Sequence, residues 1–280
     1  MRLIRFGEAG KERPGLMRGE AIVDLRRHFP EMPDIGSRFF QEGWLEKIRS
    51  VSDEGREMDT RTGPPVACPS KIVCLGINYD DHSEETGFQA PKEPLLFSKA
   101  PSALNGPTDP IVLPAGSGQV DWEVELAVVI GRQAKRIRRS EALQVVAGYT
   151  VMNDVSGREA QFSGSQWYRG KSFDTFAPMG PVLVTPDEIG SVGSLRLRSW
   201  VNGTLMQDGS TKDMIFDVAA IIESVSEDIT LMPGDVIATG TPSGVGAFRE
   251  PPVALHAGDT VECRIDGIGS IVNPVVGPTP

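Results

Sequence analysis

Residues 119–131 constrain the fold of this chain more than any other stretch. They read Gln-Val-Asp-Trp-Glu-Val-Glu-Leu-Ala-Val-Val-Ile-Gly, a run that first alternates and then becomes continuously apolar, which predicts a β-strand that ends at a glycine. Side chains two positions apart lie on the same face of a strand. One face of this strand is therefore wholly apolar, whereas Asp121, Glu123 and Glu125 share the opposite face.

The row of three carboxylates allows two interpretations. Adjacent negative charges on one face repel each other, and a divalent metal ion among them would remove that repulsion. Ligation by carboxylates alone favours Mg²⁺, Mn²⁺ or Ca²⁺ over Zn²⁺. Alternatively, the strand lies at the edge of a sheet with its acidic face in water. This stretch by itself leaves both interpretations open.

Composition excludes several classes of protein. The net charge of the 280 residues is −10 and no block of basic residues occurs, which argues against nucleic acids and anionic membranes as partners. No apolar run approaches the roughly 20 residues of a membrane span, and the first residues lack the apolar core of a signal peptide. Three cysteines without a CxxC pattern indicate reduced thiols and neither disulfides nor a zinc site. We therefore expect a soluble cytoplasmic protein.

Two structural units are predicted. Residues 1–65 form a small N-terminal α+β lobe, with strands near 1–6 and 21–25 and a weak helical pattern over 39–51. A proline-rich linker leads into a larger domain over 66–280.

The larger domain is predicted to consist mostly of strands. Its expected strands cover residues 71–77, 145–152, 195–201, 236–239, 261–265 and 268–272. Asn202-Gly203 predicts a tight hairpin turn. Helices are expected over 141–146 and 212–228, the second capped by Ser210 or Thr211, and residues 166–175 are expected to be irregular.

Several polar residues outside the acidic row are candidates for catalysis. His82 and Glu85 are three positions apart, so they meet on one face of a helical turn, and a carboxylate beside an imidazole is the usual general-base arrangement. Asp154 follows a predicted strand and suits either a third metal ligand or a turn. Lys171 could neutralise an anion in a binding pocket, or its side chain could be exposed to solvent without a role in the site. A surface histidine in a polar loop is the alternative for His82.

The glycine-rich segment at residues 240–246 reads Gly-Thr-Pro-Ser-Gly-Val-Gly and allows the backbone to approach a ligand closely. It lacks the Gly-Lys-Ser/Thr ending of a P-loop, and no helical pattern follows it to make a dinucleotide site.

Taken together, these separated motifs resemble the fumarylacetoacetate hydrolase superfamily, on its short FAHD-like branch. The resemblance covers residues 70–280. The motifs, in chain order, are Gly76-Ile77-Asn78-Tyr79-Asp80-Asp81-His82, Asp121-Trp122-Glu123-Val124-Glu125, Asn153-Asp154-Val155-Ser156, Gly170-Lys171-Ser172-Phe173-Asp174, Met232-Pro233-Gly234-Asp235 and Gly240-Thr241-Pro242-Ser243-Gly244-Val245-Gly246. The N-terminal lobe is similar to that of bacterial members described as ureidoglycolate lyases or 2,4-diketo-3-deoxy-sugar-acid hydrolases.

The resemblance implies a mixed β-sheet roll with few helices, usually assembled as a homodimer. It also implies a role for each matching residue. The implied metal ligands for Mg²⁺ or Mn²⁺ are Glu123, Glu125 and Asp154, the water-activating dyad is His82 with Glu85, the lysine beside the metal is Lys171, and the substrate-binding residues are Arg158, Gln161 and Thr241. Asp121 is not expected to be a direct ligand.

The activity implied is metal-assisted hydrolysis of a C–C bond in a β-diketo acid, such as an acylpyruvate, to pyruvate and a carboxylic acid. The metal would act as a Lewis acid on the 2-keto-acid end, and His82 would deprotonate the attacking water. Lys171 and Gln161 would stabilise the oxyanion.

Three other functions are considered. Decarboxylation of oxaloacetate or of a related keto acid, or isomerisation, would need only the same metal. Ureidoglycolate offers no 1,3-dicarbonyl to cleave and ranks lower. A non-catalytic metal-binding protein would be expected to have a damaged site, yet every catalytic residue type is present.

Overall fold

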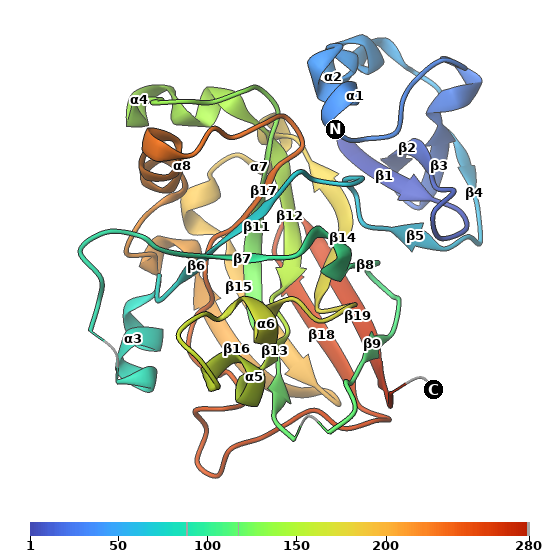
Figure 1. Ribbon diagram of the computed structural model, residues 1–280. Coiled ribbons are helices and arrows are strands. Elements are labelled where there is room, and N and C mark those ends of the chain that lie inside the picture. The colour runs from blue at the N-terminus through green and yellow to red at the C-terminus, as the bar shows by residue number, and fades with distance from the viewer. Residues whose placement is uncertain (88, 117, 279–280) are drawn as a thin grey trace.

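The protein is built on a large β-sheet that faces a smaller one (Figure 1). A computed structural model describes residues 1–87, 89–116 and 118–278. Along its main path the large sheet has the order β4-β3-β2-β1-β14-β12-β11-β17-β6-β7, while β5 pairs with β1 and β8 with β14. The smaller sheet has the order β16-β15-β18-β19-β9. The fold is mainly β with few helices, as predicted.

The strands of the large sheet are β1 (Arg2–Phe6), β2 (Arg13–Arg18), β3 (Ala21–Asp24), β4 (Arg56–Glu57), β5 (Thr62–Gly63), β6 (Ile72–Gly76), β7 (Leu95–Lys99), β8 (Leu104–Asn105), β11 (Val124–Ile130), β12 (Val146–Asn153), β14 (Ala177–Val184) and β17 (Val236–Ala238). The smaller sheet contains β9 (Ile111–Val112), β15 (Arg196–Val201), β16 (Thr204–Ser210), β18 (Thr260–Ile265) and β19 (Gly269–Val276). A separate two-stranded ribbon pairs β10 (Val120–Asp121) with β13 (Ser156–Gly157).

The α-helices are α1 (Ser37–Gln41), α2 (Trp44–Lys47), α3 (Asp80–Thr86), α4 (Arg139–Ala142), α5 (Arg158–Phe162), α6 (Tyr168–Lys171), α7 (Pro186–Ile189) and α8 (Val218–Asp228). Short 3₁₀ turns occur at η1 (Leu25–Arg27), η2 (Ile48–Ser50), η3 (Pro101–Ala103), η4 (Leu143–Val145), η5 (Val192–Ser194) and η6 (Thr211–Asp213). In the described part of the chain, no helix is long and apolar enough to cross a membrane.

Strand β11 lies in the middle of the large sheet, hydrogen-bonded to β12 on one side and β17 on the other. The interpretation of the acidic row as a water-exposed sheet edge is therefore wrong. The single strand predicted over 119–131 is divided at Trp122 and Glu123 into β10 and β11. β13 follows β12 in the chain, and it pairs with β10 in the same antiparallel register in which β12 pairs with β11. The bond from Asp154 N to the main-chain oxygen of Glu123 continues this register between the two ladders.

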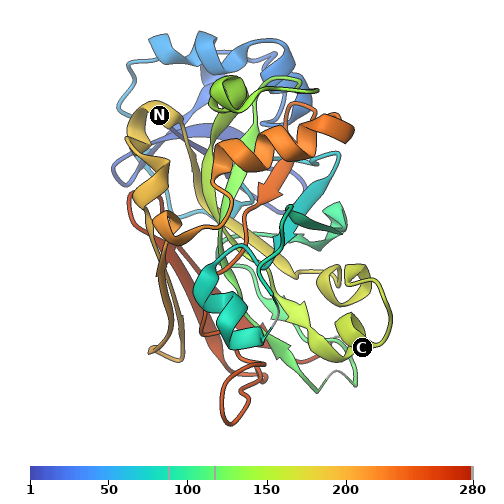
Figure 2. The same cartoon turned by 90° about the vertical axis from the view of Figure 1, so that its left-hand side faces the viewer.

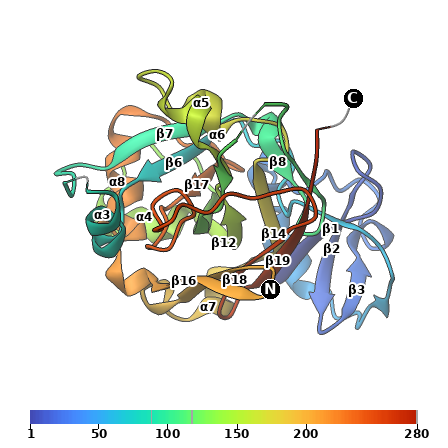
Figure 3. The same ribbon diagram turned by 90° about the horizontal axis from the view of Figure 1, so that it is seen from below.

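The two faces of β11 enter two different cores. Leu126 and Val128 belong to the core between the two sheets, which also contains Ile265 and Ile271 of the smaller sheet. Figure 3 shows the two sheets wrapping around this core as a roll. Ala127 and neighbouring small side chains on the other face belong to the core that the N-terminal segment covers.

The N-terminal segment is joined to the large sheet by hydrogen bonds as well as by packing. β1 pairs with β14 in antiparallel register, with Leu3 opposite Leu183, and Phe39 is fully buried in the core shared with β11. The helix expected over 39–51 is divided into α1 and α2, because Gly43 takes a left-handed conformation at φ 71°. The domain boundary near residue 65 stays a prediction.

The helix expected over 212–228 begins later than predicted. α8 starts at Val218 with Asp217 as its N-cap, whereas Ser210 caps only the short turn η6. Asn78 explains the delay: its main-chain oxygen accepts from Ile215 N at 2.9 Å and its side-chain oxygen accepts from Phe216 N at 2.8 Å. These bonds keep Ile215 and Phe216 out of the helix, which no local pattern signals.

Two smaller predictions have opposite outcomes. The Asn202-Gly203 hairpin is confirmed, with φ of 51° and 77° at the turn between β15 and β16. Residues 166–175 are not wholly irregular, because α6 forms within them and ends at Lys171. That short helix directs Lys171 toward Glu123, which precedes β11, and Asp154, which follows β12.

Asp235 joins the starts of two parallel strands, β6 and β17, and provides a test of the fold. It is fully buried and accepts from Met232 N at 2.7 Å, from Lys71 N at 3.2 Å and from the Ser70 hydroxyl, and it also forms an ion pair with the Lys71 ammonium. Asp235→Ala leaves these donors without their acceptor, so we expect the free energy of unfolding in urea to fall by about 2–4 kcal/mol.

The matched control is Asp208→Ala. Asp208 forms an exposed ion pair with Arg196 on the smaller sheet, and such pairs contribute little to stability. Equal losses in the two variants would mean that the Asp235 contacts do not hold β6 and β17 together.

Candidate metal centre

Three buried carboxylates meet where β11 begins and β12 ends. Glu123, Glu125 and Asp154 each place a carboxylate oxygen within 4.8 Å of the others. The antiparallel register brings them together, since Glu125 lies opposite Met152 and Asp154 N donates to the main-chain oxygen of Glu123 at 2.9 Å. The structure thus brings together the three residues that the sequence predicted as metal ligands.

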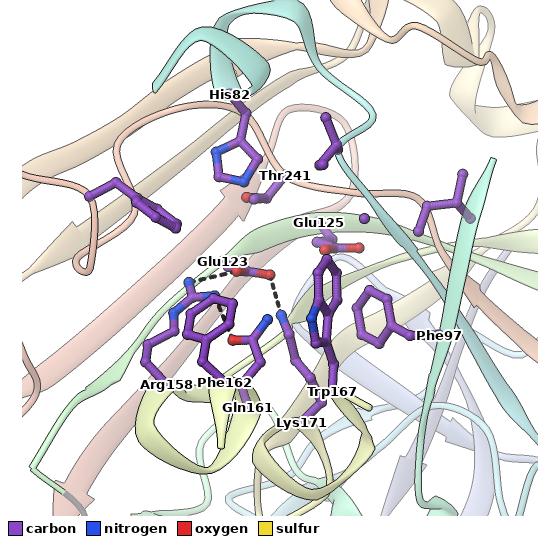
Figure 4. Close-up of a pocket in the computed structure, with 14 residues that line it drawn as sticks. His82, Phe97, Glu123, Glu125, Arg158, Gln161, Phe162, Trp167, Lys171 and Thr241 are labelled. Carbon is purple, nitrogen blue, oxygen red and sulfur yellow. Dashed lines mark hydrogen bonds and ion pairs between the residues drawn. The ribbon is translucent and has the colours of Figure 1, made fainter. Parts of the chain in front are cut away.

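Buried cations surround this cluster (Figure 4). The Lys171 ammonium donates to Glu123 Oε2 at 2.7 Å and to Asp154 Oδ2 at 2.8 Å. Arg158 Nη2 donates to Glu123 Oε1 at 2.6 Å. Burial by itself raises the pKa of Glu123, but Lys171 and Arg158 outweigh it and the net pKa is lowered. Glu123 is therefore ionised at neutral pH.

Lys99 is a member of this cluster that sequence reasoning missed. Its ammonium is fully buried and donates to Asp154 Oδ1 and to the main-chain oxygen of Val155 at 3.0 Å. Burial lowers the pKa of Lys99, against the opposing effect of Asp154. The only local signal was a lysine that ends the apolar run of β7, and such a residue is usually exposed.

Of the three carboxylates in the cluster, Glu125 has the fewest neighbours that offset its negative charge. Its Oε2 accepts from Gly240 N at 2.8 Å, whereas its Oε1 is buried without a hydrogen-bond partner among the described residues. Burial, together with the charges of Asp154 and Glu123, raises its pKa well above the ordinary value. An unsatisfied oxygen beside two further carboxylates is what a hard divalent cation would contact, so the residues present fit Mg²⁺ or Mn²⁺.

The balance of buried charge supports the same conclusion. Four buried carboxylates, the three of the cluster and Asp121, are accompanied by the three buried cations Lys99, Arg158 and Lys171. One negative charge is in excess when all seven groups are ionised. A divalent cation together with a substrate that carries one negative charge would bring the total to zero.

Asp121 has another role, in agreement with its exclusion as a ligand. Its two oxygens accept from Arg158 Nε at 2.8 Å and Nη2 at 3.0 Å, and from Ala247 N at 2.7 Å. Arg158 is thereby fixed in place by two carboxylates, Asp121 and Glu123. Its remaining nitrogen, Nη1, donates to Gln161 Oε1 at 3.0 Å, which leaves the Gln161 amide N–H groups as donors.

His82 and Glu85 form the predicted pair on α3. His82 Nδ1 lies 2.9 Å from Glu85 Oε2, and the other carboxylate oxygen, Oε1, accepts from Gly244 N at 2.8 Å. His82 is buried, so the alternative of an exposed surface histidine is wrong. Figure 4 shows its imidazole facing the carboxylates from the opposite side of the cavity.

A single cavity contains most of the predicted site residues. Its polar lining comprises His82, Glu123, Glu125, Arg158, Gln161, Lys171 and Thr241, and its apolar lining comprises Leu75, Ile77, Phe97, Phe162, Trp167 and Phe248. The Thr241 hydroxyl donates to Val124 O and accepts from Gln207 Nε2, both at 2.8 Å. Sequence reasoning missed Gln207, which lies far along the chain from every motif, and Phe248, which follows the glycine-rich segment by two residues but carries no polar group to mark it.

Comparison with known proteins identifies relatives over almost the whole chain. Residues 71–276 match the family model described as fumarylacetoacetate (FAA) hydrolase, C-terminal. The chain is 44% identical to the mitochondrial oxaloacetate tautomerase fahd2 of Xenopus laevis, over 99% of this chain and 90% of that protein. It is 46% identical to a 2,4-didehydro-3-deoxy-L-rhamnonate hydrolase of Sphingomonas sp. (strain SKA58), over 96% and 94% of the two chains.

A solved structure is also similar. The maleylpyruvate hydrolase of Sphingobium sp. SYK-6, in complex with manganese(II) and pyruvate, superposes with a TM-score of 0.82 at 33% identity, covering the whole of both chains.

The unsatisfied oxygen of Glu125 leads to a test of metal binding. Glu125→Gln preserves the shape and the bond from Gly240 N but removes the charge, so we expect Mn²⁺ to bind more than about tenfold more weakly. Titration calorimetry measures this affinity. Without metal, the variant should unfold at a temperature no lower than the wild type, because its neutral side chain avoids the cost of a buried charge.

The control is Glu141→Gln, which removes an exposed carboxylate on α4 and should bind Mn²⁺ as the wild type does. If Glu125→Gln retained wild-type affinity for Mn²⁺, Glu125 would not be a ligand.

Proposed function

The chain belongs to the fumarylacetoacetate hydrolase family, and we propose that it is a metal-dependent hydrolase that cleaves a C–C bond in an acylpyruvate or another 2,4-diketo acid. The observation that supports this most is that His82, which is bound to Glu85, faces Glu123 and Glu125 across one cavity. A held imidazole opposite a metal-binding carboxylate group can activate a water molecule against a substrate placed between them.

Glu123, Glu125 and Asp154 would hold the Mg²⁺ or Mn²⁺. When bound, the ion would supply Lewis-acid polarisation of the 2-keto-acid end of the substrate. One relative of known structure is a maleylpyruvate hydrolase in complex with manganese(II) and pyruvate, which supports a site for a metal ion and a 2-keto acid.

His82 would act as the general base through Nε2, because Nδ1 is bound to Glu85. It takes one proton from water while the water oxygen bonds to the distal carbonyl carbon. The bond from that carbon to the neighbouring methylene carbon then breaks, and its electron pair goes to the methylene carbon. The proton held on His82 is delivered there, which yields pyruvate and a carboxylic acid.

Lys171 and Gln161 are the proposed donors to the oxyanion. An ammonium has three N–H donors, of which Lys171 uses two on Glu123 and Asp154. The third is assigned to the substrate oxygen, together with the amide of Gln161. Arg158 is proposed to act on the substrate mainly by orienting Gln161. Thr241 is proposed to bind the carboxylate of the substrate. Its hydroxyl donates to Val124 O in the structure, so this hydrogen bond would have to break before the hydroxyl could donate to the substrate.

A second candidate is interconversion of the keto and enol forms of oxaloacetate. The 44% identity to an oxaloacetate tautomerase over 99% of the chain favours it. That reaction moves a proton between carbon and oxygen and requires no attack by water, so His82 alone would suffice as the base. Decarboxylation of oxaloacetate at the same metal site is a further variant of this candidate.

Assembly and location are also proposals. We propose a homodimer, which light scattering during size-exclusion chromatography measures directly. A cytoplasmic location was expected from the sequence, whereas the Xenopus relative is a mitochondrial protein.

Acetylpyruvate is the simplest substrate for the hydrolase. With Mg²⁺ or Mn²⁺ its diketone absorbance should disappear with equal formation of pyruvate and acetate, and a chelator should abolish the reaction. His82→Ala should lower kcat by about 10²–10⁴-fold and leave Mn²⁺ affinity unchanged, since His82 is not a ligand. The control is His256→Ala, which removes a histidine with an 80% exposed side chain. Wild-type turnover by His82→Ala would exclude the general-base role.

Oxaloacetate separates the second candidate from the first. A tautomerase should speed the decay of the enol absorbance of oxaloacetate without forming pyruvate, whereas a decarboxylase should release pyruvate and CO₂. A hydrolase should do neither at a rate comparable to its turnover of acetylpyruvate. If the catalysed rate of enol decay exceeds the rate of acetylpyruvate cleavage by a large factor, the protein is a tautomerase and the hydrolase proposal is wrong.

A further inference from the structure

Helix α3, which carries His82, is attached to the glycine-rich loop by two carboxylates one turn apart. We propose that Asp81 is a positioning residue: its contact with Ser243 sets the orientation of α3 and so places the His82 imidazole over the carboxylate cluster. This inference rests on the proposed role of His82 as the general base.

The Asp81 carboxylate bonds to both segments at once. Its Oδ2 accepts from the Ser243 hydroxyl at 2.7 Å and from Ser243 N at 3.3 Å. Its Oδ1 accepts from His82 N at 2.8 Å. One side chain therefore links the main chain of the catalytic histidine to the loop that also carries Thr241.

Helix α3 depends on tertiary contacts because its own sequence stabilises it little. It has only seven residues, and its N-cap residue Tyr79 forms no side-chain capping bond. Helices of this length are unstable without tertiary contacts. Figures 1 and 2 show α3 standing outside both sheets, with connecting segments at its two ends.

Two attachment points define an orientation that one point would not. Glu85 is bound to Gly244 N near the end of the helix, and Asp81 is bound to Ser243 in its first turn. Without Asp81, Glu85 still joins the end of α3 to the loop, but the first turn of the helix loses its bond to Ser243, so the helix can rotate about its end. Since His82 lies between the two points, such a rotation moves its imidazole, and a shift of about 1 Å in a catalytic group can cost about 100-fold in rate.

The other parts of the site do not rely on Asp81. The Thr241 hydroxyl is held by Val124 O and Gln207, and Glu125 is held by Gly240 N. The proposed carboxylate-binding residue and the metal ligands should therefore remain in place when Asp81 is replaced. A positioning role predicts a loss in kcat with little change in KM or metal affinity.

The first experiment compares Asp81→Ala with Glu84→Ala in the full chain. Glu84 is an exposed acid on the same helix, and its side chain forms no hydrogen bond or ion pair in the described residues. For Asp81→Ala we expect kcat for acetylpyruvate to fall about tenfold or more, with KM and Mn²⁺ affinity within about threefold of the wild type. Amide hydrogen exchange should become faster in residues 80–86 and not in β11. Glu84→Ala should match the wild type in all four measurements.

Epistasis tests whether Asp81 acts through Ser243 and His82. Ser243→Ala, a small change in a loop, should reproduce the loss, and the double variant Asp81→Ala/Ser243→Ala should lose no more than either single variant. Ser243→Thr, which retains a hydroxyl, should keep most of the activity. Adding Asp81→Ala to His82→Ala should produce no further loss in rate.

Several results would overturn the proposal. These are unchanged exchange in residues 80–86, faster exchange with unchanged kcat, additive losses with Ser243→Ala, or a further loss in the His82→Ala background. Hydrogen exchange is measured without any substrate. A protein that leaves acetylpyruvate uncleaved but shows the expected exchange would therefore contradict the proposed function and support the attachment of α3 by Asp81.

Discussion

The structure depends on the mutual neutralisation of charges inside the large sheet. Buried carboxylates are costly unless cations and hydrogen bonds accompany them. Here Lys99 from β7, Arg158 from α5 and Lys171 from α6 converge on buried carboxylates. These are Asp121 in β10, Glu123 between β10 and β11, and Asp154 just after β12. Because each partner comes from a different segment, these segments must be in place together. The acidic centre is therefore preorganised by the fold. Among its carboxylates, Glu125 keeps one oxygen without a hydrogen-bond partner in the described residues.

The glycine-rich loop at residues 240–246 provides the second set of connections. Its main-chain N–H groups donate mainly to the protein's own carboxylates: Gly240 to Glu125, Ser243 to Asp81 and Gly244 to Glu85. Gly244 has φ 103°, and a Cβ there would lie 2.1 Å from Met206 O, so the position requires glycine. The sequence predicted that this loop approaches a ligand closely. In the structure its main chain approaches Glu125, a proposed metal ligand, and helix α3, which carries the proposed general base.

Sequence reasoning succeeded where a pattern is local and failed where distant contacts intervene. The alternation of residues 119–131 correctly assigned side chains to the two faces of β11, and the spacing of His82 and Glu85 correctly predicted their contact. The start of α8 was predicted six residues too early, because 212–217 have helical spacing and Asn78, far away in the chain, keeps part of that segment out of the helix. Lys99 was missed because its apolar run resembles any edge strand that ends in a charged residue.

The sequence by itself determined the mainly β fold, the acidic face of the central strand and the family, since these follow from alternation, turn residues and motifs that neighbouring residues carry. Only the tertiary structure decided which charges neutralise one another. It assigned Asp121 to Arg158, divided Lys171 between two carboxylates and attached α3 to a loop about 160 positions away. Such partners are selected by burial and distance in three dimensions, and neither is encoded in the spacing of residues along the chain.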